Sequence, residues 1–399
     1  MVRATTGVSA EGTDVVVVGA GVVGLASAWR CAQRGLSVTV VDPRPGRGAS
    51  WMAAGMLAPV SEVHTREEPL LHLALAAAAQ WPSFAAALEE SAGSGVGYRP
   101  GGTLIVAADE GDRAWARDLL DVQLGLGLEA RWLTGRQARA LEPALAPSVR
   151  GAIDVAGDHQ VDNRLLVGTL LAAVDRAGVT LCRDEAAALV TTGGAVTGVR
   201  LRHGAPLGAG TVVVAAGCWS GGIGGLPPGA VPPVRPVKGE ILRLRPAPGA
   251  PVLARTVRAV VGGSSVYLVP RGDGTVVVGA TVEERGFDTG VRAGGVYALL
   301  RDAHRVVPAV TEMVLDEAGA GLRPGSPDNA PMVGRCPAPD TGGTVAGLVL
   351  ATGHYRHGIL LTPPTSDAVA ALAAGEEPPA VMAPFSPARF AAGAAPARP

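Results

Sequence analysis

Two segments of the sequence contain residues that commonly form binding or catalytic sites, and the first lies near the C-terminus. Residues 352–361 read TGHYRHGILL, so His354, Arg356 and His357 stand between glycines and ahead of an apolar run. Three interpretations fit such a cluster: metal ligands, an anion-binding site, or the edge of a cofactor pocket. A metal site is disfavoured, because no carboxylate or cysteine lies nearby in sequence and the Arg356 cation would repel a metal ion.

The second segment is GAGVVG at residues 19–24, which follows the β-branched run DVVVV and opens a helical stretch. In a strand–turn–helix unit, Gly19 makes the tight turn, Gly21 lets a pyrophosphate approach the backbone, and Gly24 lets the helix pack on the strand. N–H groups at the helix start donate to phosphates. Asp42 ends the next strand, where its carboxylate can accept ribose hydroxyls and repel the 2′-phosphate of NADP. The pattern predicts a bound dinucleotide, and NAD and FAD both remain open.

Periodicity predicts the elements that must hold these residues. Strands at 14–19 and 37–42 with a helix between them form a βαβ unit. Helices are expected over 62–90, over 111–142 with a break near Thr134, and over 365–375 with Thr365 or Ser366 as N-cap. Period-two alternation over 241–282 indicates an antiparallel sheet.

Length, composition and charge limit the class of protein. The chain has 399 residues, which favours two domains, and 48% hydrophobic with 17% charged residues, which favours a large core. The net charge is −1, with both signs interspersed, so neither nucleic acid nor an anionic membrane is expected as a partner.

The cysteines and the N-terminus indicate a cellular location. The four cysteines, at positions 31, 182, 218 and 336, are far apart and form no C-x-x-C pair, which is typical of a reduced protein without disulfides or zinc. The first residues lack the apolar segment of a signal peptide, and the run from Val15 to Trp29 is shorter than the ~20 residues that span a bilayer. We therefore expect a cytoplasmic protein with no metal and no stable membrane association.

Lys238 is the only lysine in the sequence, among many arginines. Either this lysine survives by chance, or its position needs a compact ammonium group.

Six segments together resemble a known family. They are GRGASWMAAGMLAP (46–59), VVVAAGCWSG (212–221), RPVKGEIL (235–242), YLVPRGDGTVVVGAT (267–281), AGLRPGSPDNAPMVG (320–334) and ATGHYRHGILLTP (351–363). With GAGVVG before them, they resemble FAD-dependent amine and amino-acid oxidases of the D-amino-acid oxidase and sarcosine oxidase superfamily. GMLAP, PVKGE and GHYRHGILL are most similar to the glycine oxidase branch, which serves thiamine biosynthesis.

The resemblance implies a fold and an assembly. It implies an α/β protein with a Rossmann-like FAD-binding domain of the GR2 type (14–85, 150–225 and 315–380) and an α+β substrate-binding domain with an antiparallel sheet (86–149 and 226–314). Residues 381–399 are expected to be a disordered tail. A homotetramer and a functional link to thiazole synthase are also implied.

The resemblance assigns residues to non-covalent FAD. Val22 and Val23 would face the pyrophosphate, Asp42 and Pro43 the adenosine ribose, and the backbone near Ala187 the adenine. The flavin and its ribityl chain would meet Ala49, Ser50, Ala54, Gly55 and Met56. The pyrimidine edge would be wrapped by His354, Tyr355, Arg356, His357, Gly358, Ile359 and Leu360, one histidine being only a packing residue.

The resemblance also assigns the substrate site. Arg323 would clamp the substrate carboxylate, Tyr267 would donate its hydroxyl to it, and Arg356 would add positive potential. No residue need act as nucleophile or base, because the flavin takes a hydride from the substrate and passes electrons to dioxygen, giving an imine and hydrogen peroxide. The amine must be neutral, so activity should rise with pH. A helix starting near Ser366 would stabilise negative charge on the flavin.

Other hypotheses remain open. Within the class, the chain could be a D-amino-acid or sarcosine oxidase, or a dehydrogenase that passes electrons to quinone. A covalent flavin would need a cysteine, for which Cys336 is the candidate. Lys238 would lie near the flavin and assist oxygen, or would simply pair with Glu240. From another class, a non-catalytic FAD-binding protein or a tRNA-modifying protein is conceivable, although the near-neutral charge argues against RNA.

Overall fold

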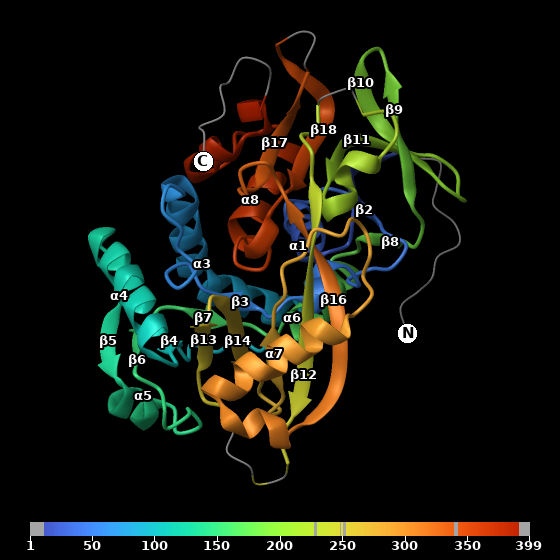
Figure 1. The fold of residues 1–399 in the computed structure, drawn as a ribbon. Helices are drawn as coiled ribbons and strands as arrows, with labels where there is room; N and C mark the ends of the chain where they lie inside the picture. The colour runs from blue at the N-terminus through green and yellow to red at the C-terminus, as the bar shows by residue number, and fades with distance from the viewer. Residues whose placement is uncertain (1–11, 227–229, 248, 250–252, 339–341, 391–399) are drawn as a thin grey trace.

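In the first of two large sheets, the strand over residues 13–18 leads into the GAGVVG turn. The structure is a computed structural model that describes residues 12–226, 230–247, 249, 253–338 and 342–390 (Figure 1). Strands of the first sheet are β1 (Thr13–Val18), β2 (Val38–Val41), β8 (Thr180–Cys182), β9 (Ala186–Thr192), β10 (Ala195–Leu201), β11 (Leu207–Val214), β17 (Met332–Pro337) and β18 (Thr344–Thr352). Their order is β17-β18-β11-β1-β2-β8, with β10 and β9 attached to β11. All pairs along this path are parallel except β17–β18.

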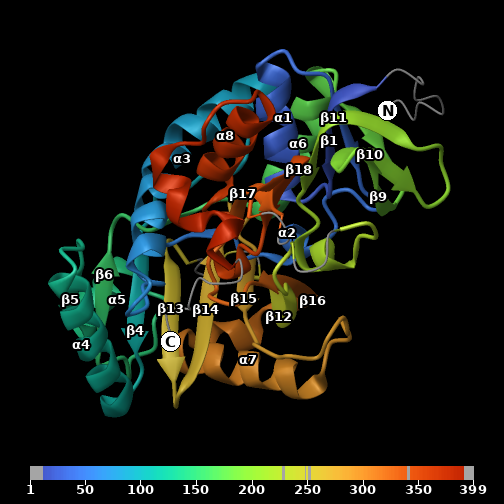
Figure 2. The same cartoon turned by 90° about the horizontal axis from the view of Figure 1, so that it is seen from above.

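Alternate valines of β1 face two different layers. Val15 and Val17 pack into the core with helices α1 (Val22–Gln33), α3 (Glu68–Ala92), α6 (Asn163–Arg176) and α8 (Thr362–Ala373). Val16 and Val18 pack against β9, β10 and β11 on the other face. The helices lie together on one side of the sheet, and the β9–β10 hairpin lies on the other (Figure 2). This two-sided burial explains the continuous apolar run of the strand.

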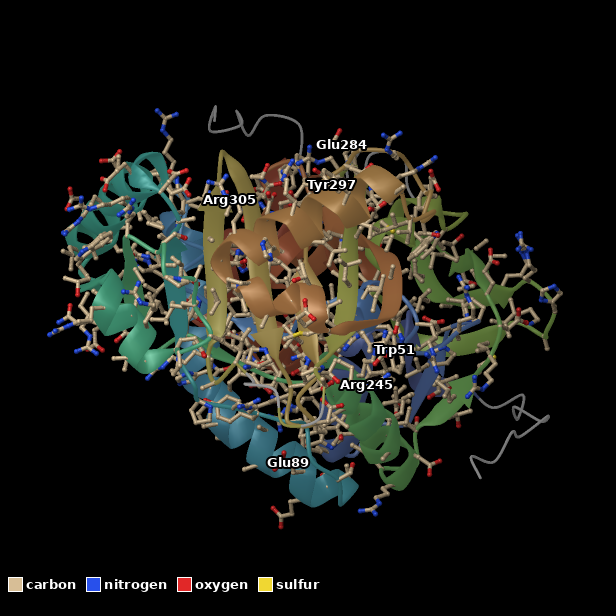
Figure 3. The ribbon with its side chains drawn as sticks, turned by 60° about the horizontal axis from the view of Figure 1, so that its bottom comes forward. Trp51, Glu89, Arg245, Glu284, Tyr297 and Arg305 are labelled. Carbon is tan, nitrogen blue, oxygen red and sulfur yellow. The ribbon has the colours of Figure 1, made fainter. Side chains whose placement is uncertain are left out.

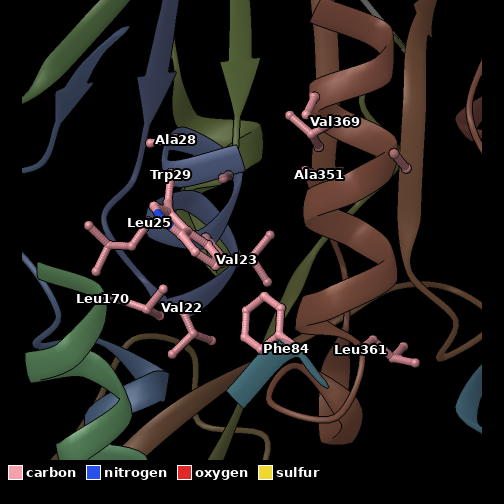
Figure 4. Packing of buried hydrophobic residues seen from close by; sticks show 14 of the residues in the cluster. Val22, Val23, Leu25, Ala28, Trp29, Phe84, Leu170, Ala351, Leu361 and Val369 are labelled. Atoms are coloured by element: carbon pink, nitrogen blue, oxygen red, sulfur yellow. The ribbon is translucent and has the colours of Figure 1, made fainter. Parts of the chain in front are cut away.

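Aromatic side chains join three of these helices. In Figure 4, Trp29 of α1 and Phe84 of α3 point toward one another beside α8, and their ring centroids are 5.7 Å apart in a T-shaped arrangement. Trp81 of α3 is fully buried, and its indole N–H donates to the backbone oxygen of Leu360 at 2.8 Å. The Leu360 oxygen lies just before α8, so this hydrogen bond joins α3 to the start of α8.

The second sheet is almost wholly antiparallel. Its strands are β4 (Thr103–Ala107), β5 (Arg131–Thr134), β6 (Gly151–Val155), β12 (Arg235–Arg245), β13 (Thr256–Val261), β14 (Ser264–Pro270), β15 (Val276–Gly279) and β16 (Val314–Gly325). The order is β16-β12-β15-β14-β13-β4-β6-β5, and only β13–β4 is parallel. Helix α7 (Ala293–Val306) lies across these strands with Tyr297 and Arg305 upon it (Figure 3), while α4 (Glu110–Gly125) packs on β4 and β6.

Short elements complete the fold. They are α2 (Ala49–Met52), the pair β3 (Met56–Leu57) and β7 (His159–Gln160), α5 (Gly135–Leu141), and the 3-10 helices η1 (Gly217–Gly222), η2 (Pro308–Glu312), η3 (Tyr355–His357), η4 (Ala380–Phe385) and η5 (Pro387–Phe390).

Three predicted helices have other boundaries. The helix expected over 62–90 starts at Glu68, because the N–H groups of Val60 and Ser61 donate to the buried Asp158 carboxylate and hold the chain in turns. The helix expected over 111–142 divides into α4, β5 and α5, because β5 pairs with β6. The closing helix begins at Thr362, since prolines fit the first turn, where no N–H is needed.

The sheets and the tail differ from the expected domain ranges. β6 pairs with β4, and β16 pairs with β12, so both belong to the second sheet although the ranges expected for the FAD-binding domain, 150–225 and 315–380, include them. The domain division itself stays a proposal. The tail expected from residue 381 starts later, because Met382 and Phe385 are buried against the core helices. Residues 391–399 of that tail lie outside the described residues.

By length and composition alone, α3 is the one helix in the described part of the chain that could cross a membrane. One face of α3 is buried in the core, with Leu73, Ala77, Trp81, Phe84 and Leu88 at helical spacing. That burial is typical of a core helix.

The hydrogen bond from Trp81 leads to a stability prediction. Trp81→Phe removes the only side-chain donor to the Leu360 oxygen among the described residues, and we expect the free energy of unfolding to fall by about 1–3 kcal/mol. Urea unfolding measures the change. Trp115→Phe, on the exposed side of α4, is the matched control and should change it by less than about 0.5 kcal/mol. Equal effects of the two variants would contradict this account.

Candidate active site

A cavity of about 820 Å³ extends between the two sheets. One end is lined by the GAGVVG turn and the end of β2, the middle by residues 47–56, and the other end by strands of the second sheet and residues 351–359. It lies at the carboxyl ends of β1, β2, β11 and β18, where open parallel sheets bind ligands. The cavity is thus bordered by both sequence segments that suggested chemistry.

The GAGVVG turn has the close contacts that require glycine. Gly19 has φ +107°, and a Cβ on it would lie 2.5 Å from the Ala215 backbone oxygen. A Cβ on Gly24 would overlap the Gly19 carbonyl, so Gly24 serves helix–strand packing and does not line the cavity. Gly19, Gly21, Val22 and Val23 do line it. No acidic residue lies in the first turn of α1, so its N-terminus presents positive potential to the cavity.

Polar groups beside this turn face the same end. Asp42 and Pro43 line the cavity, and the Asp42 carboxylate accepts hydrogen bonds from the N–H groups of Ala20 and Arg44, each at 2.7 Å. A carboxylate has about four acceptor positions, so ribose hydroxyls can still be bound. The Ser50 hydroxyl accepts from the Val22 N–H at 3.1 Å and joins the turn to the 48–56 segment.

The 48–56 segment is held from behind by a buried arginine. Ala49, Ser50, Ala54, Gly55 and Met56 all line the cavity. The Arg271 guanidinium donates to the Ala54 oxygen at 2.7 Å and to the Asn163 side-chain oxygen at 2.9 Å. The Asn163 amide donates to the backbone oxygens of residues 50 and 51, each at 2.9 Å. Burial lowers the pKa of Arg271 to about 10, so it remains a cation at neutral pH.

The histidines of the 352–361 segment are buried and neutral. His354 lines the cavity and shares a 3.0 Å hydrogen bond with the Thr365 hydroxyl. Burial, followed by the smaller effect of neighbouring His357, lowers the pKa of His354 to about 3. His357 lies outside the lining, 3.7 Å from Glu62, and burial lowers its pKa to about 4. Within the described residues, no group of three or more His, Cys, Asp or Glu is arranged to hold a metal.

Other residues of this segment divide between lining and packing. Tyr355, Arg356, Gly358 and Ile359 line the cavity, and Leu360 is buried behind them. Arg356 lies 4.0 Å from Glu67. The segment therefore forms an edge of the cavity, and its role as a cofactor-edge loop stays a prediction.

Arg323 and Tyr267 meet at the far end of the cavity over two glycines. A Cβ on Gly239 would lie 2.5 Å from Cζ of Arg323, and a Cβ on Gly279 would lie 2.5 Å from Cζ of Tyr267. The Arg323 guanidinium donates to the Thr281 oxygen at 3.2 Å. It also donates to the Lys238 oxygen at 3.4 Å and forms a hydrogen bond with Tyr267, and since a guanidinium has five N–H donors, further donors remain for a ligand. Burial raises the pKa of Tyr267, which outweighs the opposite effect of Arg323, so its hydroxyl stays protonated.

Besides Gly24, His357 and Leu360, three more residues singled out in the sequence lie away from the lining. Ala187 is one residue beyond Glu185 and Ala186, which do line the cavity. Lys238 is fully buried, and its ammonium donates to Glu240 at 2.7 Å and to the Gly290 oxygen. Cys336 is buried in β17, and its thiol donates to the Ala230 oxygen. Lys238 is thus the partner of Glu240, and Cys336 does not border the cavity.

The sequence did not reveal several lining residues of the substrate end. They include Glu62, His64, Arg258 and Ser265. Ser265 lies two residues before Tyr267 in β14, and Arg258 lies opposite Tyr267 in β13. The alternation of side chains along these strands could therefore have indicated that all three share one face of the sheet. Glu62 and His64 lie in turns that periodicity had placed in a helix.

A glycine turn opens a helix onto the same cavity that Arg323 and Tyr267 line, and such a turn is typical of dinucleotide-binding enzymes. The family described as FAD dependent oxidoreductase (DAO) matches residues 14–372, and the chain belongs to this family.

Individual relatives match over most of the chain. Glycine oxidase of Geobacillus kaustophilus is 35% identical over 94% of this chain and 96% of that protein. The crystal structure of glycine oxidase from Geobacillus kaustophilus has a TM-score of 0.84 and covers 94% of this chain and 98% of that one at 35% identity. The bifunctional protein ThiO/ThiG of Synechocystis is 33% identical over 95% of this chain but 54% of that protein. The chain spans about half the length of such bifunctional relatives.

The residues present fit the FAD of this family. Gly19, Gly21, Val22 and Val23 line the cavity at the start of α1, where backbone N–H groups suit a pyrophosphate. The turn 19–23, Asp42, Pro43, the segment 48–56 and residues 354–359 would hold the cofactor. When bound, it supplies an acceptor for a hydride.

The close contact between the Arg323 guanidinium and Gly239 leads to a binding prediction. Gly239→Ala should push the flexible guanidinium of Arg323 aside without unfolding the protein, and weaken the binding of acetate to the FAD-loaded protein about tenfold or more. Calorimetric titration measures this. Gly272→Ala is the control, because a Cβ there meets nothing within 4 Å. Unchanged acetate affinity in Gly239→Ala would show that this contact does not position Arg323 for carboxylate binding.

Buried His354 leads to a pH prediction. Its pKa is about 3 in the folded protein and about 6.5 in an unfolded chain, so the unfolded chain alone binds this proton between these values. The stability contribution is complete above pH ~6.5 and is lost as the pH falls, by up to about 1.4 kcal/mol per pH unit. His354→Gln should flatten the decline measured by urea unfolding from pH 6.5 to 4.5. His72→Gln, on the exposed face of α3, should keep the wild-type slope.

Proposed function

We propose that the protein catalyses the flavin-dependent oxidative deamination of glycine and of similarly small amines such as sarcosine or D-alanine. The imine product hydrolyses to glyoxylate and ammonia, and dioxygen is reduced to hydrogen peroxide. The observation that carries this proposal is the Arg323–Tyr267 pair, which faces the same cavity as the flavin-binding segments. The relatives named glycine oxidase, which match over nearly their whole length, support the choice of glycine.

Arg323 and Tyr267 would bind the substrate carboxylate. Two N–H groups of a guanidinium match the two carboxylate oxygens, which fixes both position and orientation. The Tyr267 hydroxyl keeps its proton because burial raises its pKa, so it can donate to the same carboxylate. A clamp of this kind directs the substrate Cα–H toward the flavin segments.

The surroundings of the clamp fix the charge near the substrate. Arg356 adds positive potential, and the neutral imidazole of His354 adds none. Residues of the 354–359 segment lie at the cavity edge, where backbone N–H groups favour negative charge.

The resemblance supports further proposals about context. We propose a cytoplasmic homotetramer with a functional link to thiazole synthase, and dioxygen as electron acceptor. D-amino-acid oxidase or sarcosine oxidase-like activity is the second candidate within the class, because the same clamp would bind any small amino acid. Purification of FAD-loaded protein and measurement of its mass in solution test the assembly.

The clamp leads to a kinetic prediction. Arg323→Ala should raise KM for glycine at least about 30-fold, equivalent to about 2 kcal/mol, while FAD stays bound. Peroxide formation and the visible absorbance of the flavin measure the two properties. Arg335→Ala, in β17 away from the cavity, is the control.

The same assay tests the substrate. Peroxide formation by the wild-type protein should be faster with glycine or sarcosine than with D-proline or larger D-amino acids. Faster turnover of bulky D-amino acids would overturn the glycine assignment, and wild-type kinetics in Arg323→Ala would remove the clamp.

A further inference from the structure

A second arginine lies beside the carboxylate clamp. Arg258 in β13 pairs directly with Tyr267 in β14, so the two side chains lie next to one another on one face of the sheet. Arg258, Tyr267 and Arg323 all line the substrate end of the cavity. Both arginines act electrostatically on the Tyr267 hydroxyl. The cavity therefore holds two guanidinium groups near the place of a substrate, although an amino acid such as glycine has only one carboxylate.

Glu62 forms an ion pair with the second guanidinium, that of Arg258. Its carboxylate lies 2.9 Å from Arg258, and the two side chains are only 12% and 17% exposed. Burial raises the pKa of Glu62, but Arg258, His357 and Arg356 outweigh burial and hold the pKa below its usual value. Glu62 is thus an anion at neutral pH.

The backbone fixes Glu62 in front of Arg258. The N–H groups of Val60 and Ser61 donate to the buried Asp158 carboxylate at 3.1 and 2.7 Å. Arg258 also reaches the Ser61 hydroxyl at 3.4 Å. The carboxylate is therefore held in place by two residues that immediately precede it.

The charges at this end of the cavity leave one arginine for a ligand. Arg258 is paired with Glu62, and Arg356 lies 4.0 Å from Glu67. Arg323 has hydrogen bonds to backbone oxygens and no carboxylate partner within the described residues. One unpaired guanidinium matches a substrate with one carboxylate, and a second anionic group would meet Glu62.

We propose that Glu62 determines specificity: by occupying Arg258 it restricts the site to amino acids with a single carboxylate. Without the charge of Glu62, Arg258 would bind the second carboxylate of a dicarboxylate such as iminodiacetate. The inference rests on the proposed function in one respect, since it takes Arg323 and Tyr267 as the binding site of the first carboxylate.

Binding of two unreactive acids tests the proposal without turnover. Glutarate has the length of iminodiacetate and two carboxylates, and valerate has the same five carbons with one carboxylate. In calorimetric titrations of FAD-loaded protein, the wild type should bind glutarate no more tightly than valerate. Glu62→Gln should improve the affinity for glutarate relative to valerate about tenfold or more, because an unpaired buried guanidinium gains a partner.

Two further variants separate charge from shape. Glu62→Asp keeps the negative charge and should keep the wild-type preference. Glu62→Gln/Arg258→Gln removes the guanidinium as well, and the gain for glutarate should disappear. In Glu62→Gln, the kcat/KM for iminodiacetate should also rise relative to the kcat/KM for glycine, mainly because the KM for iminodiacetate falls. The other two variants should not show this rise.

The outcomes are decisive in both directions. The proposal predicts a change of about tenfold, or about 1.4 kcal/mol, in the ratio of glutarate affinity to valerate affinity. If this ratio in Glu62→Gln stays within about twofold of the wild-type ratio, the proposal is overturned. A gain that persists in the double variant overturns the role of Arg258. If Glu62→Gln does not retain FAD, Glu62→Met removes the same charge and is judged by the same ratio. A wild type that does not oxidise glycine refutes the proposed function, whereas the binding ratios still decide the role of Glu62.

Discussion

The substrate end of the site depends on two places where strands of the second sheet carry no side chain. The guanidinium of Arg323 lies on Gly239 and the ring of Tyr267 lies on Gly279, and in both cases a Cβ would approach Cζ to 2.5 Å. The position of each polar group is therefore set by the main chain beneath it. β12, which contains Gly239, is in turn braced by the buried Lys238–Glu240 pair at 2.7 Å. A buried ion pair contributes little net stability, but it fixes local geometry here next to the arginine.

The two halves of the cavity are joined by buried polar contacts. Arg271, at the end of β14, donates to the Ala54 oxygen, and Asn163 at the start of α6 donates to the segment 50–51. These contacts connect the strand of Tyr267 to the segment that borders the flavin site. A reaction between a cofactor and a substrate requires a constant distance between the segments that bind them. Buried hydrogen bonds behind those segments hold this distance fixed. The close match to a glycine oxidase structure, with a TM-score of 0.84, extends over both halves.

Local patterns explain what the sequence could predict. The GAGVVG turn, Asp42 and the βαβ unit follow from neighbours in sequence, because their glycines and their cap positions have local causes. The residue segments of the resemblance also placed Arg323, Tyr267 and His354 at one cavity. Glu62 and Arg258 could not be paired in advance, because their contact joins a turn after β3 to β13. The start of α3 was misplaced for the same reason, since Asp158 lies far along the chain from Val60.

The charges of the substrate end have a consequence for how the site responds to pH. Its positive potential comes from arginines, which do not lose their protons at any physiological pH. Both histidines of the 352–361 segment are held neutral by burial, with pKa values of about 3 and about 4. Tyr267 keeps its proton because burial raises its pKa. These groups therefore present one fixed field to an amino acid across the neutral range, and the ionisation that matters for reaction belongs to the amine of the substrate. The segment that first suggested a metal site or an anion site thus contributes the cation of Arg356 and the neutral imidazole of His354 to this field.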